Sequence, residues 1–225
     1  MNNIPQFVAQ ISIAAPPVMF AIILHEVMHG VVAKALGDDT AARAGRLTLN
    51  PIAHVDPFGT IILPAILLFA GAPVFGYAKP VPVDYRNLHN PRTGMMMVAA
   101  AGPLTNLTLA AISIVLLLLI RPHLDGPWAP SLWVPIFEML QISLSVNVGL
   151  GIFNLIPILP LDGGRVLVGF LPYSAARAMA RFEGVGFLLL FGLLYFRGFN
   201  LALGRIIHGV EEVLVLMIVG IARML

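Results

Sequence analysis

The chain contains no cysteine and few charged residues. Without cysteine, neither a disulfide nor a thiolate metal ligand can form, so any bound metal must be held by histidine and carboxylate side chains. Charged residues make up 11% of the 225 residues and hydrophobic residues 59%, and the mean hydropathy is +0.92. Because a soluble domain needs a more polar surface than this, the sequence predicts an integral membrane protein.

Other absences narrow the class of protein further. The net charge is only +2, and no stripe of basic residues alternates with aromatics, so no nucleic-acid partner is expected. The first 24 residues lack a basic start and a small-x-small cleavage site, so they are predicted to remain as a membrane helix. No soluble domain, low-complexity linker or internal repeat is recognisable. We therefore expect one membrane domain over 1–225, with a core at 5–172 and C-terminal helices at 184–225.

Uncharged runs mark the predicted membrane spans, since a hydrocarbon core of about 30 Å needs about 20 apolar residues in a helix. The clearest run is 94–120, followed by 132–156 and 4–24. The helix that begins in 4–24 should continue to about Leu36, with Gly37 as its C-cap. Shorter apolar stretches follow at 166–172, 184–196 and 199–220. These patterns predict an all-α polytopic membrane protein with about five to six transmembrane helices.

The first uncharged run ends in the motif His25-Glu26-Val27-Met28-His29. On a helix, side chains at positions i and i+4 point the same way, so His25 and His29 can both bind one Zn²⁺. Glu26 can take a proton from a zinc-bound water and act as general base in peptide hydrolysis. The simpler alternative is a polar helix end that reaches the lipid headgroups.

Residues 57–78 are long enough to cross the membrane once, but they contain the helix breakers Pro64, Gly71, Pro73 and Gly76. Basic residues flank the segment on both sides, namely Lys34, Arg43 and Arg46 before it and Lys79, Arg86 and Arg92 after it. The positive-inside rule then places both flanks in the cytoplasm, which favours a re-entrant hairpin. The same rule places the N-terminus and 121–131 outside, and the metal motif near the cytoplasmic face.

A catalytic zinc site usually has three protein ligands, and Asp162 is the candidate for the third. It follows an apolar run that Pro157 and Pro160 interrupt, and two glycines come directly after it. Non-helical backbone at membrane depth is tolerated only where protein or a water-filled cavity satisfies its polar groups, so an acidic residue there suggests a functional site. The alternative is that Asp162 caps the next helix while Arg165 contacts lipid phosphate. The residues alone leave both open.

Taken together, these motifs resemble the site-2 protease family of intramembrane zinc metalloproteases. The motifs occur in the order of that family: His25-Glu26-x-x-His29, Gly102-Pro103-Leu104-x-Asn106, and Phe153-Asn154-Leu155-Ile156-Pro157 leading into Leu161-Asp162-Gly163-Gly164. The resemblance implies that His25, His29 and Asp162 bind zinc. It also implies that Glu26 is the general base, and that Asn154 holds substrate or the developing oxyanion. No PDZ-like or CBS-like domain is recognisable, so the chain is similar to a compact prokaryotic form.

Three further features leave more than one interpretation open. His54 lies among prolines that favour a turn, but it is also a candidate for contacts behind the ligands or for an alternative ligand. Asn106 lies four residues after Gly102 on the same helix face, where it either orients a ligand or joins two helices. Residues 43–49 alternate weakly between polar and apolar side chains, which predicts a small β-strand element whose edge pairs with an extended substrate.

These observations predict an intramembrane zinc endopeptidase that acts in regulated intramembrane proteolysis, hydrolysing peptide bonds in or near transmembrane segments. Its expected partners are transmembrane-helix protein substrates and the lipid bilayer of the cell membrane, with no oligomeric state specified. The alternative is a catalytically inactive protein that binds a membrane partner, or a metal carrier. Transporters often contain inverted repeats, which this chain lacks. Glu26 also has no use in a site that only carries metal.

Overall fold

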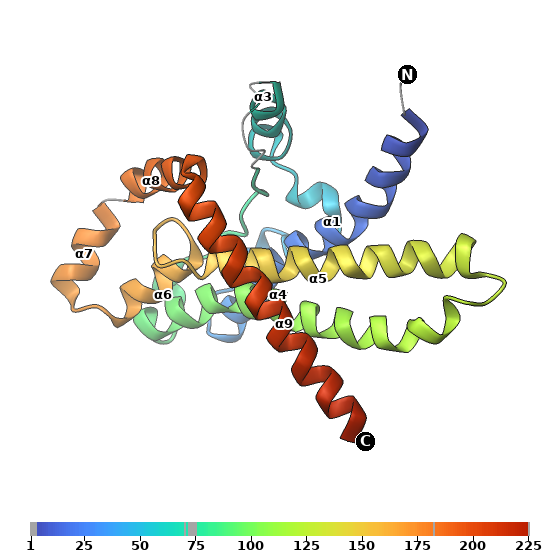
Figure 1. Ribbon diagram of the computed structural model, residues 1–225. Coiled ribbons are helices and arrows are strands. Elements are labelled where there is room, and N and C mark those ends of the chain that lie inside the picture. Colours follow the sequence, from blue (N-terminus) through green and yellow to red (C-terminus); the bar gives the residue numbers. More distant parts are fainter. Residues whose placement is uncertain (1–3, 70, 72–75, 182, 225) are drawn as a thin grey trace.

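The computed structural model describes residues 4–69, 71, 76–181 and 183–224, and all regular secondary structure in these residues is helical (Figure 1). The α-helices are α1 (Ile4–Ala35), α2 (Thr40–Arg43), α3 (Leu63–Phe69), α4 (Pro91–Ile120), α5 (Val134–Asn154), α6 (Asp162–Phe170), α7 (Tyr173–Arg181), α8 (Glu183–Tyr195) and α9 (Arg197–Met224). Short 3₁₀ or π turns are η1 (Pro51–His54), η2 (Pro57–Ile62), η3 (Tyr85–Asn87), η4 (Arg121–His123) and η5 (Ala129–Trp133). The all-α prediction is therefore confirmed.

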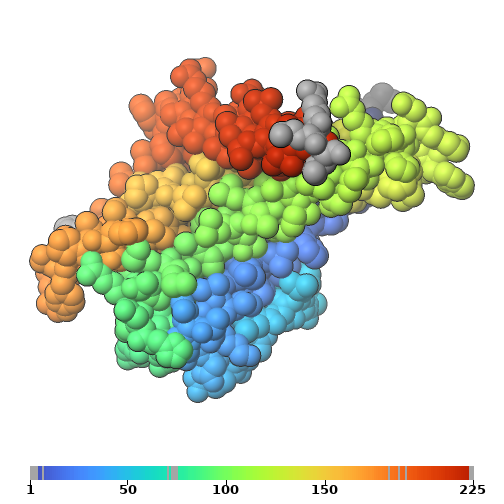
Figure 2. Space-filling model, turned by 90° about the horizontal axis from the view of Figure 1, so that it is seen from below, coloured from blue at the N-terminus to red at the C-terminus, as the bar shows by residue number. Residues whose placement is uncertain are grey.

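Helix α4 is the centre of the molecule and contacts α1, α5, α6 and α9. It begins at Pro91, directly after Asn90, whose side chain accepts a hydrogen bond from the Thr93 N–H at 3.2 Å and caps the helix. Its buried residues are mostly glycine, alanine and other small residues, which let neighbouring helices approach closely. Figure 2 shows α1 on one side of α4 and α9 on the other.

Three helical stretches are long and apolar enough to cross a membrane: Val8–Ala35, Pro91–His123 and Ala129–Asn154. A fourth span exists if α7 and α8, which meet at 58°, are counted together. The protein is thus a multi-pass membrane protein by its helices, but the predicted number of five to six spans is too high. Helix α8 alone has only 13 residues, and α9 carries Arg205, Glu211 and Glu212 among its apolar residues, which lowers its hydropathy.

The predicted β-strand at 43–49 is wrong. Arg43 ends the short helix α2 and forms an ion pair with Asp39 at 2.9 Å, one helical turn earlier. Gly45 then turns the chain with a φ of +65°. A strand also needs a neighbour for its backbone hydrogen bonds, and none of the described residues forms a strand that would pair with this segment.

The segment 57–78 leaves the bundle and returns to the place where it began. It starts with η2 and continues as α3, which projects away from the other helices (Figure 1). On return, the Tyr77 N–H donates to the Gly59 carbonyl at 3.0 Å, and the Lys79 N–H donates to the His54 carbonyl at 2.9 Å. The two ends of the segment are therefore joined. Of the predicted helix breakers, Pro73 lies outside the described residues.

An extended segment, 79–84, then runs back to the bundle and is fixed at both ends; we call it the strap. At its start, the guanidinium of Arg46 donates to the Lys79 carbonyl at 2.7 Å. At its end, the Asp84 N–H donates to the carboxylate of Asp38 at 2.8 Å. Asp38 also accepts hydrogen bonds from Thr40 and from the Asn87 amide, the latter at 3.0 Å. This one carboxylate therefore ties the strap to the segment that follows α1.

Helix α1 ends as the sequence predicts. It runs through the His-Glu motif to Ala35, and Gly37 follows with a φ of +112°. The Asp38 N–H donates back to the Ala33 carbonyl at 2.9 Å, which satisfies one of the last carbonyls of the helix. This turn places Asp38, completely shielded from solvent, where it can receive the hydrogen bonds from the strap.

Candidate metal centre

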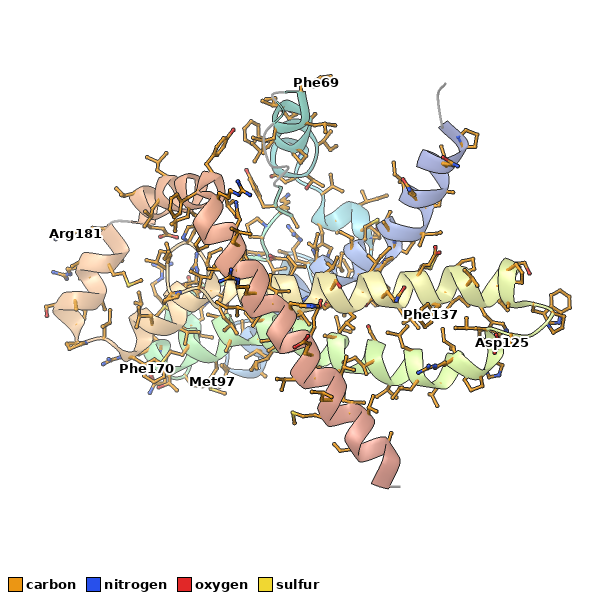
Figure 3. All side chains as sticks on the ribbon, viewed as in Figure 1. Phe69, Met97, Asp125, Phe137, Phe170 and Arg181 are labelled. Atoms are coloured by element: carbon orange, nitrogen blue, oxygen red, sulfur yellow. The ribbon has the colours of Figure 1, made fainter. Side chains whose placement is uncertain are left out.

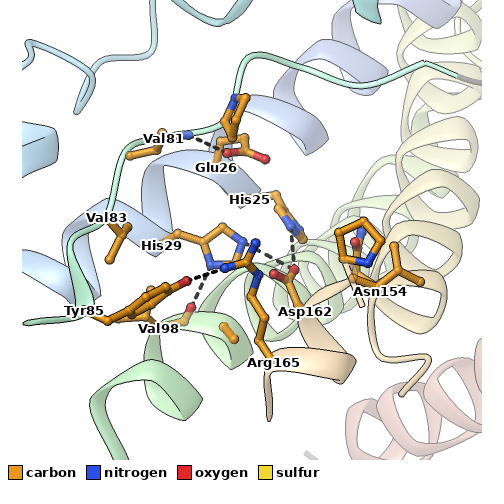
Figure 4. Close-up of a pocket in the computed structure, with 14 residues that line it drawn as sticks. His25, Glu26, His29, Val81, Val83, Tyr85, Val98, Asn154, Asp162 and Arg165 are labelled. Carbon is orange, nitrogen blue, oxygen red and sulfur yellow. Dashed lines mark hydrogen bonds and ion pairs between the residues drawn. The ribbon is translucent and has the colours of Figure 1, made fainter. Parts of the chain in front are cut away.

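Three ligand-type atoms converge between α1 and α6 (Figure 4). His25 and His29 lie one turn apart on α1, and Asp162 is the first residue of α6. The Oδ2 atom of Asp162 is 3.1 Å from His25 Nε2 and 3.4 Å from His29 Nε2. Each residue offers a ligand atom, and the three atoms lie within 4.8 Å of one another. The structure thus brings together the three residues that the sequence suggested as metal ligands.

Both histidines are held in the same tautomer by contacts behind the site. His25 Nδ1 lies 2.5 Å from the side-chain oxygen of Asn106, and His29 Nδ1 lies 2.7 Å from the Val98 carbonyl. Because both partners are acceptors, each Nδ1 must carry the hydrogen and donate it. Each neutral ring is then left with a lone pair on Nε2, which points at Asp162.

The resulting arrangement fits a cation. In the neutral tautomer two imidazole lone pairs face Asp162 Oδ2, which is buried and has no hydrogen-bond donor. Three such atoms repel one another unless a positive charge lies between them. Two nitrogens and one carboxylate oxygen are a usual donor set for catalytic zinc. Tetrahedral zinc with metal–ligand distances of about 2.0–2.1 Å needs neighbouring ligand atoms about 3.3 Å apart, close to the two distances found here.

A chain of buried polar groups supports His25 from behind. The Asn106 amide donates to the Ala21 carbonyl at 3.2 Å and to the side-chain oxygen of Asn147 at 2.7 Å. The Asn147 amide donates in turn to the Ser143 carbonyl at 2.8 Å. Asn106 therefore joins α1, α4 and α5 and also contacts the metal-ligand candidate His25. The two roles considered for this residue, joining helices and orienting a ligand, thus involve the same network of hydrogen bonds. A fully satisfied network of this kind fixes a side chain within apolar surroundings.

Two glycines allow the helices to approach the site closely. A Cβ atom at Gly102 of α4 would lie 2.5 Å from His29 Nε2 and 2.6 Å from His25 Nε2. A Cβ atom at Gly163 would lie 2.2 Å from the Leu155 carbonyl oxygen. No other residue fits these positions without moving the neighbours. Gly102 thus lets α4 cover the histidines, and Gly163 lets α6 begin where Asp162 faces them.

A cavity of about 340 Å³ adjoins the three residues. Glu26, Asn154, Tyr85 and Arg165 line it, together with Val81 and other residues of the strap. Glu26 accepts a hydrogen bond from the Val81 N–H at 2.9 Å, so one of its oxygens is fixed by backbone. The Asn154 amide donates to the Leu150 carbonyl of its own helix at 3.0 Å. A candidate base and converging ligands thus share one cavity.

His54 lies elsewhere. Its Nε2–H donates to the Thr48 carbonyl at 2.8 Å, and the residue lines a second cavity, of about 320 Å³, between α1 and the 57–78 segment. It does not belong to the group of converging ligand atoms.

Sequence reasoning missed the part that Arg165 and Tyr85 play in the cavity. Arg165 follows Asp162 by three residues, so helical spacing alone would have placed both on one face. Tyr85 carries no such signal.

Comparisons with known proteins agree with this site. A model of peptidase family M50 matches residues 129–195. The chain is 40% identical over 166 residues to "Putative zinc metalloprotease YwhC" of Bacillus subtilis, which covers 74% of this chain and 72% of that protein. It is 31% identical over 179 residues to "Putative zinc metalloprotease Rip2" of Mycolicibacterium smegmatis, which covers 78% of this chain and 64% of that protein. The chain belongs to peptidase family M50, the site-2 proteases.

As an M50 protease, the protein is a zinc metalloprotease with protein substrates, and the predictions of family, enzyme class and metal are confirmed. The cluster of His25, His29 and Asp162 is consistent with a zinc site. No solved structure matches the chain. The M50 family match and the three apolar helices together identify a multi-pass membrane protease.

Proposed function

We propose that this M50 protease is an intramembrane endopeptidase that hydrolyses peptide bonds in or near transmembrane segments of membrane proteins. One observation carries the proposal: two of the three converging ligand atoms, those of His25 and His29, lie on α1 within Val8–Ala35, a helix apolar enough to span the membrane. A substrate helix in the bilayer would thus meet the site at membrane depth. The broken backbone before Asp162 and the adjoining cavity supply the polar, water-accessible surroundings that hydrolysis requires.

In this proposal His25, His29 and Asp162 hold the zinc. Bound Zn²⁺ supplies Lewis-acid chemistry, since it acidifies a water and polarises a carbonyl. Glu26 takes the proton from the attacking water and later delivers it to the nitrogen of the leaving amine. The hydrogen bond from Val81 to one Glu26 oxygen leaves the other oxygen free to accept that proton.

Other residues have supporting roles. Asn106 orients His25 through its hydrogen bond to Nδ1, as contacts behind metal ligands commonly do. Asn154 lines the cavity, where its side chain can hold the substrate backbone. The strap is extended and lines the same cavity. Its backbone, rather than that of 43–49, would therefore pair with an unwound substrate. His54 supports the 57–78 segment.

For the topology, we propose one domain over 1–225 with a core at 5–172 and C-terminal helices at 184–225, in which 57–78 is re-entrant and the active site is nearer the cytoplasmic face. The hydrogen bonds between the two ends of the 57–78 segment favour a hairpin. Because the chain lacks cysteine, Arg43→Cys and Arg86→Cys can each be labelled alone. Both should react from the cytoplasmic side, and Asp125→Cys, beyond α4, should react from the outside. Labelling of positions 43 and 86 from opposite sides would show a full crossing.

The test of the proposed activity separates catalysis from metal binding. We expect purified wild-type protein to contain zinc and to cleave a model transmembrane substrate in detergent or liposomes. Glu26→Gln should keep the zinc but lose at least about 10³-fold in rate, because the amide cannot accept the proton of the water. Glu138→Gln, an exposed carboxyl on α5, is the matched control and should behave as wild type.

The outcomes also address the alternative of an inactive binding protein or metal carrier. The metal carrier would be favoured if wild-type protein binds zinc reversibly but cleaves neither a membrane substrate nor a soluble peptide. In that case Glu26→Gln should also leave zinc binding unchanged. Against it stands Glu26, which lines the cavity beside the ligands and is held by a backbone N–H. A site that only transports metal has no need for a positioned base.

A further inference from the structure

One permanent positive charge lines the catalytic cavity. Arg165 lies on α6 three residues after Asp162, so both side chains project from the same face of that helix. Among the described residues that line the cavity, Arg165 is the sole lysine or arginine. Figure 4 shows its side chain extending from α6 toward Tyr85, along the cavity that holds the two histidines.

Arg165 is held in place by two neighbours but is not saturated by them. Its Nη1 donates to the Tyr85 hydroxyl at 3.1 Å, and its Nη2 lies 3.4 Å from a carboxylate oxygen of Glu183 on α8. A guanidinium carries five N–H groups, and these contacts engage two. The side chain is about one-third exposed, so the other donors can face the cavity. A positioned cation with free donors is thus available beside the candidate metal ligands.

Peptide hydrolysis places a demand on this cavity that the residues discussed so far do not fully meet. When water attacks the carbonyl carbon, the electron pair of the C=O bond moves onto the oxygen, which becomes negative. A pre-positioned donor aimed at that oxygen is worth about 10²–10³ in rate. The amide of Asn154 already donates one N–H to the carbonyl of Leu150. Arg165 brings a full positive charge and uncommitted donors.

We propose that Arg165 is a catalytic residue that stabilises the negative charge developing on the scissile carbonyl oxygen. The inference rests on the proposed function. Arg165 donates hydrogen bonds and transfers no proton: the proton of the water goes to Glu26, and from there to the amine nitrogen when the C–N bond breaks. Tyr85 and Glu183 are positioning residues that hold the guanidinium over the cavity.

The kinetic test compares removal of the charge with removal of its supports. Arg165→Gln should lower kcat by about 10²–10³-fold and change KM by less than about threefold, because the lost interaction exists mainly in the transition state. Arg165→Lys keeps the charge but loses the planar fork, so its kcat should be intermediate. Glu183→Gln should cost less than about tenfold. Arg177→Gln removes an exposed arginine on α7 and should match wild type. Zinc content should be unchanged in all four.

A binding experiment tests the same idea without turnover. A peptide in which an anionic phosphinate replaces the scissile amide should bind Arg165→Gln about 10²-fold more weakly than wild type, by calorimetry. The parent peptide, bound to variants that also carry Glu26→Gln to prevent cleavage, should lose less than about threefold. Equal losses for both peptides would make Arg165 a general substrate-binding residue and overturn the proposal.

Other results would overturn it as well. Loss of zinc in Arg165→Gln would show that the residue maintains the metal site. A Glu183→Gln effect as large as that of Arg165→Gln would show that the contact between α6 and α8 is what matters. If wild type cleaves a soluble peptide but no transmembrane substrate, the proposed membrane activity fails, and the kcat ratio on the soluble peptide still tests Arg165. If wild type cleaves neither substrate, the ratio of phosphinate affinities between wild type and Arg165→Gln still tests the role of Arg165.

Discussion

Helix α4, which packs against the helices that hold the metal-ligand candidates, differs in its packing from the outer helices α3 and α7. Helix α4 buries a row of mostly small residues against α1, α5 and α6, including Val98, Gly102 and Asn106. Helices α3 and α7 bury none of their described residues. Phe69, at the end of α3, is 91% exposed and points away from the bundle (Figure 3).

The difference follows from what each region must do. A metal centre needs its ligands fixed to within a fraction of an ångström, and here close helix packing and a satisfied polar network provide this. The outer elements present apolar side chains outward, such as Leu188 on α8 and Leu216 on α9, each 72% exposed. Apolar surface of this kind is stable against lipid or against another membrane helix. The protein therefore combines a rigid centre with a periphery that suits a bilayer.

The largest contrast should come from comparing a substitution at the metal centre with one at a histidine outside it. We expect Asp162→Ala to lose most of the zinc and all measurable activity, because it removes one of three ligands. His54→Ala should keep most of both, since His54 lines the other cavity. Metal analysis and cleavage of a model substrate would check this. The reverse pattern would make His54 the ligand and contradict the arrangement in Figure 4.

A smaller effect should come from a single methyl group at the centre. Gly102→Ala places a carbon 2.5 Å from His29 Nε2, so either the helices separate or the imidazole turns. By analogy with mutations behind metal ligands, we expect zinc affinity to fall about 10–100-fold. Gly149→Ala on α5 is the matched control, because its Cβ meets no atom within 4 Å. Zinc titration of both variants gives the comparison, and equal affinities would show that α4 does not need to approach the histidines closely.

The smallest effect is expected at Asp38, outside the spans, where it shows as pH-dependent stability. Burial alone raises the pKa of this carboxyl, but hydrogen bonds from Asn87, Thr40 and the Asp84 N–H together lower it below its ordinary value of about 3.9. The carboxylate therefore stabilises the fold at neutral pH, and this contribution is lost as the pH falls below about 3.9 through the folded-state pKa.

Asp38→Asn should accordingly cost about 2 kcal/mol at pH 7, and the difference from wild type should shrink in acid. Asp39→Asn, which breaks an exposed pair with Arg43, should cost about 0–1 kcal/mol. Unfolding in detergent at several pH values measures both. A difference between Asp38→Asn and wild type that stays constant below pH 3 would contradict the role of the ionised carboxylate.

Much of the centre could be predicted from residue order. The i, i+4 spacing of His25 and His29 needs only a helix, and long apolar runs predict that helix within a membrane. Two predictions were wrong, for different reasons. The weak alternation at 43–49 did not produce a strand, because no described strand pairs with it. The count of spans was too high, because α9 is long but carries polar residues within its apolar pattern.

By itself, the sequence determined the helical class, the membrane setting and the pairing of His25 with His29 as candidate ligands, because hydropathy and helical spacing are local properties. Asp162 was added only by the resemblance to a family, since its own surroundings in the sequence left two interpretations open. Only the tertiary structure decided how distant residues combine. It placed Asp162 against two histidines more than 130 positions earlier in the chain, and Arg165 beside Tyr85. It also joined Asn106 to His25. These contacts arise where glycines allow the backbones of α1, α4 and α6 to approach, and no local pattern encodes which surfaces then meet.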